Sequence, residues 1–211
     1  MLTKIAAKLQ DDGLLETLAF LRKKLVRVEK HQVYIASCAN AEEPDWLPGE
    51  QVCYSSYKAL WDRIVSEQLA ALPVRNRDYL QAVSRGEAKG LAVLYNDKIV
   101  HCAFLMCRNK STALLGFDKN VGLLGNAFTI DSYRGRGCQA RSVAARIKMA
   151  EQAGLDRVIS ATSYDNLSSQ RGLVHGGMKF FGNAELFVLL NTLVVRYKRP
   201  DNSIKRVELC W

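Results

Sequence analysis

A glycine-bearing turn is the part of this chain best suited to chemistry, and it reads Arg134-Gly135-Arg136-Gly137-Cys138-Gln139-Ala140. An apolar, strand-like run precedes the turn, and a long pattern typical of an amphipathic helix follows it. The glycine backbone can approach a ligand closely, and the first N–H groups of a helix have no acceptor within the helix. Because these donors and the helix dipole both favour an anion, the segment predicts a phosphate-holding turn.

Positive charge gathers around this turn. Residues 131–150 carry five basic side chains and one acidic one, Asp131, in a chain with a formal net charge of +9 at pH 7. This balance predicts an anionic partner, but it does not separate nucleic acid from a phosphorylated cofactor or an acidic surface. No basic–aromatic motif typical of RNA binding is present, which disfavours nucleic acid.

A cluster of carboxylates lies far from the turn in sequence, around Trp46. It comprises Glu42, Glu43, Asp45 and Glu50. The cluster could face a cationic substrate or belong to a solvated loop, and the sequence leaves both interpretations open. The side chains of Trp46, Tyr57 and Trp61 likewise fit either an acceptor pocket or the core.

Composition predicts one globular domain, since 48% of the 211 residues are hydrophobic, 24% are charged and no tract is biased. Charged residues interrupt the N-terminus before an apolar leader can form, so we expect the six cysteines to be reduced, in the cytoplasm. No cysteine pair has metal-ligand spacing, and no apolar run is long enough for a membrane span. We therefore expect neither a metal site nor a membrane span.

Periodicity predicts helices in the first part of the chain and strands from residue 90 onward. Helices are expected over 12–25, 57–68 and 77–83, and a strand over 32–36 that a polar segment follows. Adjacent antiparallel strands are expected over 91–95, 99–107, 112–117 and 121–130, with a hairpin turn at Asn96-Asp97.

The helix after the glycine turn has one apolar stripe, and Arg141, Arg146 and Lys148 fall off it. Gly154 is placed to end this helix. A strand over 158–162 follows, and the length of the crossover predicts that it runs parallel to the strand before the turn. The remaining elements expected are a helix over 166–175 and strands starting near Met178, over 186–197 and around Val207.

This order of elements, with these residues, resembles the GNAT superfamily of acyl-CoA-dependent N-acyltransferases. The superfamily signature at a strand–helix junction is Arg or Gln, two residues, Gly, one residue, then Gly or Ala. Arg134 and Gly137 match the first and fourth positions, whereas Gln139 stands where a small residue is expected. The Gln139 side chain could crowd a bound pyrophosphate, or it could turn outward while Ala140 supplies the close approach.

The resemblance continues into the second helix, where Asn166, Ser169, Gly177 and Met178 stand at matching positions. The implied fold class is α/β (α+β), with a mixed, mostly antiparallel central sheet flanked by helices and an additional N-terminal helix. We expect a single domain over 1–211. Its parts are a helical extension over 1–30, an acyltransferase core over 31–199 and a C-terminal segment over 200–211.

The resemblance also implies where acyl-CoA would bind. The backbone of Ala127, Phe128 and Thr129 would pair with the pantetheine arm, where neighbouring strands splay. Asn166 would contact the cofactor beside the thioester. The pyrophosphate would lie on the turn and the first helical residues, which are Arg134, Gly135, Arg136, Gly137, Cys138, Gln139 and Ala140.

The implied reaction is direct transfer, in which an amine attacks the thioester carbonyl and a backbone N–H on the splayed strand stabilises the oxyanion. No covalent enzyme intermediate is needed. The amine must lose a proton and the CoA thiolate must gain one, which commonly involves a carboxylate or His and a Tyr. Leu173 occupies the position of the usual acidic tyrosine, and Ala161 that of a glutamate in some members, so neither can move a proton.

Other side chains are candidates for proton transfer. Tyr164 is the candidate acid, or else a structural tyrosine. Asp131 could be the base or could cap the turn, and His175 and His101 either titrate near neutral pH or are structural. Cys138, at a helix N-terminus among arginines, is placed to favour a thiolate, although direct transfer needs no nucleophilic cysteine.

These observations predict a cytoplasmic N-acetyltransferase that transfers the acetyl group of acetyl-CoA to a primary amine without a metal. No motif specifies the acceptor, which could be a small amine, an amino sugar or a protein amine. The alternatives are a long-chain N-acyltransferase of the N-acyl amino acid or acyl-homoserine lactone type, and a non-catalytic CoA-binding or regulatory protein. The oligomeric state, a homodimer included, is left open.

Overall fold

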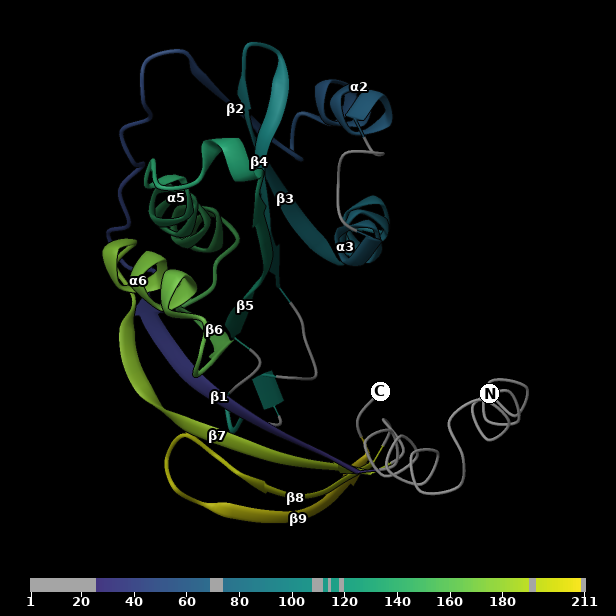
Figure 1. Ribbon diagram of the computed structural model, residues 1–211, viewed down its shortest axis with the longest axis vertical. Helices are drawn as coiled ribbons and strands as arrows, with labels where there is room; N and C mark the ends of the chain where they lie inside the picture. Colours follow the sequence, from purple (N-terminus) through teal and green to yellow (C-terminus); the bar gives the residue numbers. More distant parts are fainter. Residues whose placement is uncertain are drawn as a thin grey trace, which may run out of the picture. The chain divides into compact units, whose positions relative to one another are not determined.

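The computed structural model describes residues 26–68, 74–107, 112–113, 115–117, 120–189 and 193–209 (Figure 1). The chain divides into two compact units, one of Gln32–Phe181 and one of Met1–His31 with Gly182–Trp211. The single domain stays a prediction. The helix expected over 12–25 lies outside the described residues.

The larger unit contains a sheet with strand order β2-β3-β4-β5-β6-β1-β7. Strands β2 to β5 are successive antiparallel neighbours, whereas β5 and β6 run parallel. The predicted α/β class with a mixed, mostly antiparallel sheet is therefore confirmed. The strands are β1 (Val26–Ser37), β2 (Glu50–Tyr54), β3 (Ala88–Tyr95), β4 (Lys98–Met106), β5 (Val121–Thr129), β6 (Arg157–Ser163) and β7 (Lys179–Leu189), of which β1 and β7 also contribute residues to the smaller unit.

Helices cover both faces of this sheet (Figure 1). On one face lie α2 (Lys58–Gln68) and α3 (Val74–Ser84), and on the other α5 (Cys138–Gln152) and α6 (Leu167–His175). Successive residues of β3 serve the two faces: Leu91 and Val93 join the core under α5, while Ala92 and Leu94 join the core with Trp61 of α2. Because β3 is buried on both faces, its sequence is a continuous apolar run.

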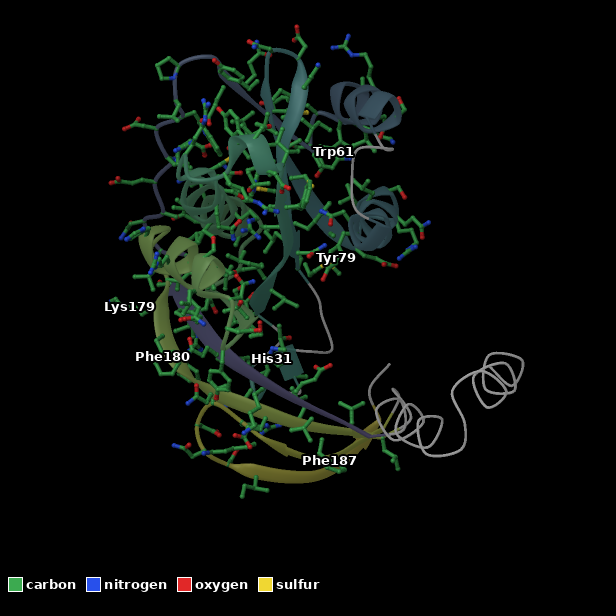
Figure 2. All side chains as sticks on the ribbon, in the orientation of Figure 1. His31, Trp61, Tyr79, Lys179, Phe180 and Phe187 are labelled. Atoms are coloured by element: carbon green, nitrogen blue, oxygen red, sulfur yellow. The ribbon has the colours of Figure 1, made fainter. Side chains whose placement is uncertain are left out.

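The aromatic rings of α2 and α3 lie over glycines of the sheet. Trp61 and Tyr79 project from these helices toward the strands (Figure 2), and a Cβ atom on Gly125 would lie 2.6 Å from the Tyr79 ring. Tyr79 also stacks on Phe104 of β4, with ring centroids 5.2 Å apart. Trp61 is 4% exposed, so it belongs to the core, whereas Tyr57 is 66% exposed.

Some sequence predictions of strands need correction. Thr112 and Ala113 are helical and Gly116 lies in a turn, so the described part of 112–117 is not a strand. The segment after 32–36 contains strand β2, which pairs with β3 and was not expected. The run 186–197 is two antiparallel strands, β7 and β8 (Leu193–Lys198). Most residues of this run favour strands, so strand preference alone does not reveal the reversal.

Two predicted turns are confirmed. Asn96 and Asp97 have φ values of 50° and 59° between β3 and β4, as a type I′ hairpin requires. Gly154, with φ 73°, follows the end of α5. In the smaller unit β8 pairs with β7 and with β9 (Ile204–Leu209), which confirms the strand expected around Val207.

Helices α5 and α6 approach closely because Gly172 and Gly176, one turn apart, face α5. A Cβ atom on Gly176 would lie 2.5 Å from Cβ of Val143 and 2.7 Å from the carbonyl oxygen of Ala140. A Cβ atom on Gly172 would overlap the side chain of Gln139. The contact therefore fixes the start of α5 against α6.

His101, on β4, is a core residue. Its side chain is fully buried, its Nδ1 lies 2.8 Å from Thr129 Oγ1, and its Nε2 has no hydrogen-bond partner among the described residues. Burial, together with the nearby cations of Arg146 and Arg141, lowers the pKa of His101 to about 3. The imidazole is therefore neutral at pH 7, which favours the structural alternative for His101 over one that titrates near neutral pH.

We expect Gly172→Ala to destabilise the protein by about 1–3 kcal/mol, because its methyl group overlaps Gln139. In a Gln139→Ala background the same substitution should become neutral or stabilising, since alanine favours a helix over glycine by up to about 1 kcal/mol. Gly176→Ala is the matched control: it meets the backbone of Ala140, so Gln139→Ala should give no relief. Urea unfolding measures each change, and an equal effect of Gly172→Ala in both backgrounds would contradict the contact.

His101 should make stability depend on pH. Its pKa is about 3 in the folded protein and about 6.5 in the unfolded chain, so protonation below pH 6.5 favours unfolding. Between pH 7 and pH 5 the wild-type protein should lose about 2 kcal/mol more unfolding free energy than His101→Asn. Chemical denaturation of both proteins at the two pH values checks this, and parallel losses would show that His101 is accessible to protons.

Candidate active site

Strands β5 and β6 pair only where residues 121–123 meet residues 157–159. Beyond this point β5 stays paired with β4 on its other side. One side-chain hydrogen bond connects β6 to β5 there, from Ser160 Oγ to the Leu124 carbonyl oxygen at 3.3 Å. The two strands therefore splay. The residues expected to contact pantetheine, Ala127, Phe128 and Thr129, lie in the splayed part of β5.

A bulge lies in the same part of β5. Cys102 pairs with Phe128 and Phe104 pairs with Gly125, so residues 126–127 of β5 together oppose Ala103 of β4. Such an extra residue locally breaks the ladder and re-aims the backbone groups beside it.

Arg146 of α5 lies buried beside the bulge, with 1% of its surface exposed. Its Nη1 donates to the carbonyl oxygens of Phe104 and Gly125, at 3.2 and 3.0 Å, and its Nε donates to that of Ser142 at 3.1 Å. Burial lowers the pKa of Arg146 to about 9, which leaves the guanidinium a cation at pH 7. The helical pattern puts Arg146 off the apolar stripe but cannot reveal carbonyl acceptors on other elements.

The turn that follows has the geometry of an anion cradle. After the 3₁₀ helix η2 (Asp131–Tyr133), Gly135 and Gly137 have φ values of 80° and 71°, a region that favours glycine. The Arg141 N–H donates to the Gly137 carbonyl oxygen at 3.2 Å, as the first hydrogen bond of α5. The N–H groups of residues 138–140 therefore have no acceptor within the helix.

The carboxylate of Glu50 supports this turn. Its side chain is fully buried and pairs with Arg141, whose Nη2 lies 2.7 Å from Oε1. The Tyr133 hydroxyl donates to the same oxygen at 2.8 Å, and the Leu47 N–H donates to Oε2 at 2.8 Å. Arg141 also donates to the carbonyl oxygen of Arg136 at 2.8 Å. Glu50 thus connects β2 to the glycine turn through these hydrogen bonds. No local sequence signal indicated this role.

The other members of the acidic cluster, Glu42, Glu43 and Asp45, are exposed, as expected of a solvated loop. Trp46 is half-buried against the core, with its ring 5.8 Å from the guanidinium of Arg141. The loop therefore supports the turn through Trp46 and Glu50.

The side chain of Gln139 lies against Gly172 of α6. It is therefore engaged between the helices, which favours the outward alternative for this departure from the signature. The exposed side chains of the turn are also engaged. Arg134 Nη2 lies 2.9 Å from Asp131, and the Arg136 guanidinium lies 4.8 Å from the Tyr133 ring centroid.

Asn166 begins helix α6. Its side-chain oxygen accepts the Ser169 N–H at 3.1 Å, which is the usual function of an asparagine N-cap. Gln170 donates to the carbonyl oxygens of Ser163 and Tyr164, at 3.1 and 2.9 Å. The loop between β6 and α6 is therefore fixed by its own side chains, and the contact of Asn166 with a cofactor stays a prediction.

The three proton-transfer candidates belong to different segments of the chain and are all exposed. Tyr164 follows β6 and is 36% exposed. Asp131 is exposed and pairs with Arg134. His175 is exposed in the last turn of α6, roughly 13 Å along the helix from the end nearest Tyr164 at 1.5 Å per residue. No hydrogen bond that we find in the described part of the chain joins any two of the three.

Three further residues bear on the chemistry. Leu173 is 1% exposed in the core and Ala161 is exposed on β6, so neither position supplies a proton. Cys138 is buried, and burial together with the Glu50 carboxylate raises the pKa of its thiol to about 12. The predicted thiolate is therefore wrong, because desolvation outweighs the nearby arginine and the helix dipole.

Among the described residues, no three His, Cys, Asp or Glu side chains are grouped so that they could hold a metal ion. None of the helices in the described ranges is both long enough and apolar enough to cross a membrane.

No family model matches this chain, and no curated protein does. Solved structures do. The GCN5-related glucosamine N-acetyltransferase region of a fungal multi-domain GH3 β-N-acetylglucosaminidase superposes with a TM-score of 0.56 at 15% identity, over 82% of this chain and 22% of that one. A Drosophila protein gives 0.54 at 17% identity, over 84% and 57%.

A functionally unknown protein from Staphylococcus epidermidis gives a TM-score of 0.51 at 9% identity, over 81% of this chain and 64% of that one. This chain therefore spans less than two thirds of the length of each of the three structures. The chain has the fold of the GCN5-related N-acetyltransferases.

Proposed function

We propose that this chain is an acyl-CoA-dependent N-acyltransferase that uses acetyl-CoA and a primary amine. The observation that carries the proposal is that two features follow each other along the chain. The first is the splayed, bulged strand β5, and the second is the glycine turn at the start of α5. One presents an unpaired strand edge and the other presents backbone donors to an anion. The fold shared with GCN5-related acetyltransferases supports the same reading.

The backbone of the glycine turn is suited to a bound pyrophosphate. Left-handed Gly135 has open space where a Cβ atom would lie, whereas a Cβ atom on Gly137 would lie 3.2 Å from Arg141 Nη1. Residues 138–140 offer N–H groups. In the proposed complex residues 134–140 hold the pyrophosphate, residues 127–129 hold the pantetheine arm, and Asn166 lies beside the thioester. Acyl-CoA supplies the activated acyl group.

In the proposed reaction the amine nitrogen bonds to the thioester carbonyl carbon and the carbon–sulfur bond breaks, giving an amide and CoA thiol. A backbone N–H from the bulge of β5 stabilises the negative charge on the carbonyl oxygen. Tyr164 is the candidate proton donor to the sulfur, because it follows the splayed strand β6 and is accessible. Asp131 and His175 remain candidate bases. A long-chain acyl donor is an alternative that a comparison of donors decides.

A non-catalytic CoA-binding protein is the second candidate. It is favoured by buried Leu173 and by Ala161, which stand where the resemblance implies proton-transfer groups. Such a protein would bind acetyl-CoA but transfer nothing to a panel of primary amines. Transfer to any amine in the panel would exclude it.

We expect Gly135→Ala to weaken acetyl-CoA binding at least tenfold, since a side chain at φ 80° distorts the turn. Gly154→Ala is the matched control, because Gly154 has φ 73° at the other end of α5 and neither residue has an atom within 4 Å of its added Cβ. Both should lose about 1–2 kcal/mol of stability, but only the first should lose affinity. Calorimetric titration measures the affinities; wild-type protein that binds no acetyl-CoA at millimolar concentration would contradict the proposed function.

Tyr164→Phe tests the proton donor. If the hydroxyl protonates the departing sulfur, kcat should fall about 10²- to 10⁴-fold while the KM for acetyl-CoA stays constant. The phenyl ring preserves the packing of this partly exposed side chain, so melting temperature should not change. Steady-state transfer to a primary amine gives both constants. An unchanged kcat would assign the proton donor to another group.

A further inference from the structure

The bulge in β5 is held from both faces of the sheet. On the α5 face, Arg146 donates to the carbonyl oxygens of Phe104 and Gly125. On the α3 face, the side-chain amide of Asn126 donates to Asn76 Oδ1 at 2.8 Å. The irregular part of β5, where ladder pairing is broken, is therefore fixed by two helices.

Asn76 is suited to this role because it is itself immobilised. It is 1% exposed, and its Nδ2 donates to Cys102 Sγ at 3.0 Å. That bond leaves Oδ1 directed at Asn126. Beside it, the Tyr79 ring occupies the space that a side chain on Gly125 would fill. The bulge thus has a defined position relative to α3.

The buried charge of Arg146 has a large desolvation cost, of several kcal/mol in general. Arg146 forms no ion pair with a carboxylate among the described residues, and its acceptors are backbone carbonyl oxygens. An apolar side chain of similar length would fill the same space without that cost. The charge of Arg146 therefore acts on the peptide groups that the guanidinium contacts.

The Gly125 carbonyl and the Asn126 N–H belong to one peptide unit. No peptide bond in the described chain is cis, so this N–H points away from the carbonyl oxygen and hence away from Arg146. A cation that binds the oxygen polarises the unit and makes the N–H a stronger donor, as in any chain of hydrogen bonds within a low-dielectric interior. The bulge consequently presents a strengthened N–H on its side opposite Arg146.

We propose that Arg146 is a positioning residue for acyl transfer, which holds the β5 bulge and strengthens the Asn126 N–H as the donor to the thioester oxygen. This inference rests on the proposed function. Negative charge develops on that oxygen as the amine nitrogen bonds to the carbonyl carbon. The charge leaves the oxygen when the carbon–sulfur bond breaks, and the CoA thiolate takes up the proton that the amine loses. A donor fixed before the reaction stabilises this charge without reorganisation.

Infrared spectroscopy of bound acetyl-CoA, labelled with ¹³C at the thioester carbonyl, tests the proposal without an acceptor. A stronger hydrogen bond to the oxygen lowers the C=O stretching frequency. We expect the largest lowering in the wild-type protein, a smaller one in Arg146→Lys and the smallest in Arg146→Met. Lys148→Met is the matched control, since it removes a positive charge from the same helix outside the bulge and should leave the band in place. Equal frequencies in all four proteins would overturn the proposal.

Kinetics separate this role from a purely structural one. Arg146→Met should lower kcat about 10- to 100-fold, because outright removal of an oxyanion donor lowers kcat about 10²- to 10³-fold and this variant only weakens the donor. The KM for acetyl-CoA should stay within about twofold. Arg146→Lys should recover part of kcat. A change confined to KM or to melting temperature would show that Arg146 only packs, and would overturn the proposal.

Asn76→Ala keeps the test decisive should Arg146→Met fail to fold. It releases Asn126 from α3 while Arg146 stays in place, so kcat should fall and the carbonyl band should broaden. An unchanged kcat and band in both Asn76→Ala and Arg146→Lys would refute the inference. Wild-type protein that binds labelled acetyl-CoA without lowering its carbonyl frequency would also refute it, whereas failure to bind acetyl-CoA at all would refute the proposed function.

Discussion

Strand β5 leaves β6 after residue 123 but keeps its pairing with β4, and this asymmetry shapes everything around the candidate site. Backbone groups freed from a ladder inside a protein need other partners. At the bulge, the partner is the guanidinium of Arg146 from α5. Along the splayed edge no strand of the described chain pairs with β5 beyond residue 123 except β4. Helix α5 must lie where it does for Arg146 to reach these carbonyls.

The same placement of α5 determines the position of the glycine turn, because the helix begins directly after Gly137. The positive charge around the turn is smaller than the composition suggests. Arg141 is paired with buried Glu50, Arg134 is paired with Asp131, and Arg146 is buried. The proposed binding of an anion at this turn therefore relies more on oriented backbone N–H groups than on free cations. Glu50 contributes by holding Arg141 and Tyr133 in place, although it is itself acidic.

The proposed chemistry relies on position and polarisation more than on proton transfer. The site has a bulge held by hydrogen bonds, a buried cation behind it and a glycine turn, but its candidate acids and bases are exposed and lie on different elements. Direct transfer suits such a site, since orientation of the reactants and a preorganised donor to the oxyanion account for much of the barrier reduction in acyl transfer. Leu173, at the position where the resemblance implies a proton-donating tyrosine, is buried in the core.

The correct predictions from the sequence rest on local rules. The glycine turn, the hairpin at Asn96-Asp97, the end of α5 at Gly154 and the parallel crossover follow from dihedral preferences, capping and connection length, which act over a few residues. The extra strand β2 was missed because its evidence is its partner β3, which lies some 40 residues away in sequence. The division of 186–197 into two strands was missed for a related reason, since each strand is defined by pairing.

The sequence by itself determined that a helix begins directly after a glycine turn, because φ preferences and the free N–H groups of a first helical turn are properties of the local chain. The tertiary structure alone decided what that helix does to its neighbours. Gln139 turns to Gly172, Glu50 reaches Arg141, His101 is neutral and Arg146 binds the bulge. Each of these depends on burial and on acceptors that distant segments supply. A side chain's charge and direction in a core are set by the groups that surround it in space, and the order of residues along the chain does not contain them explicitly.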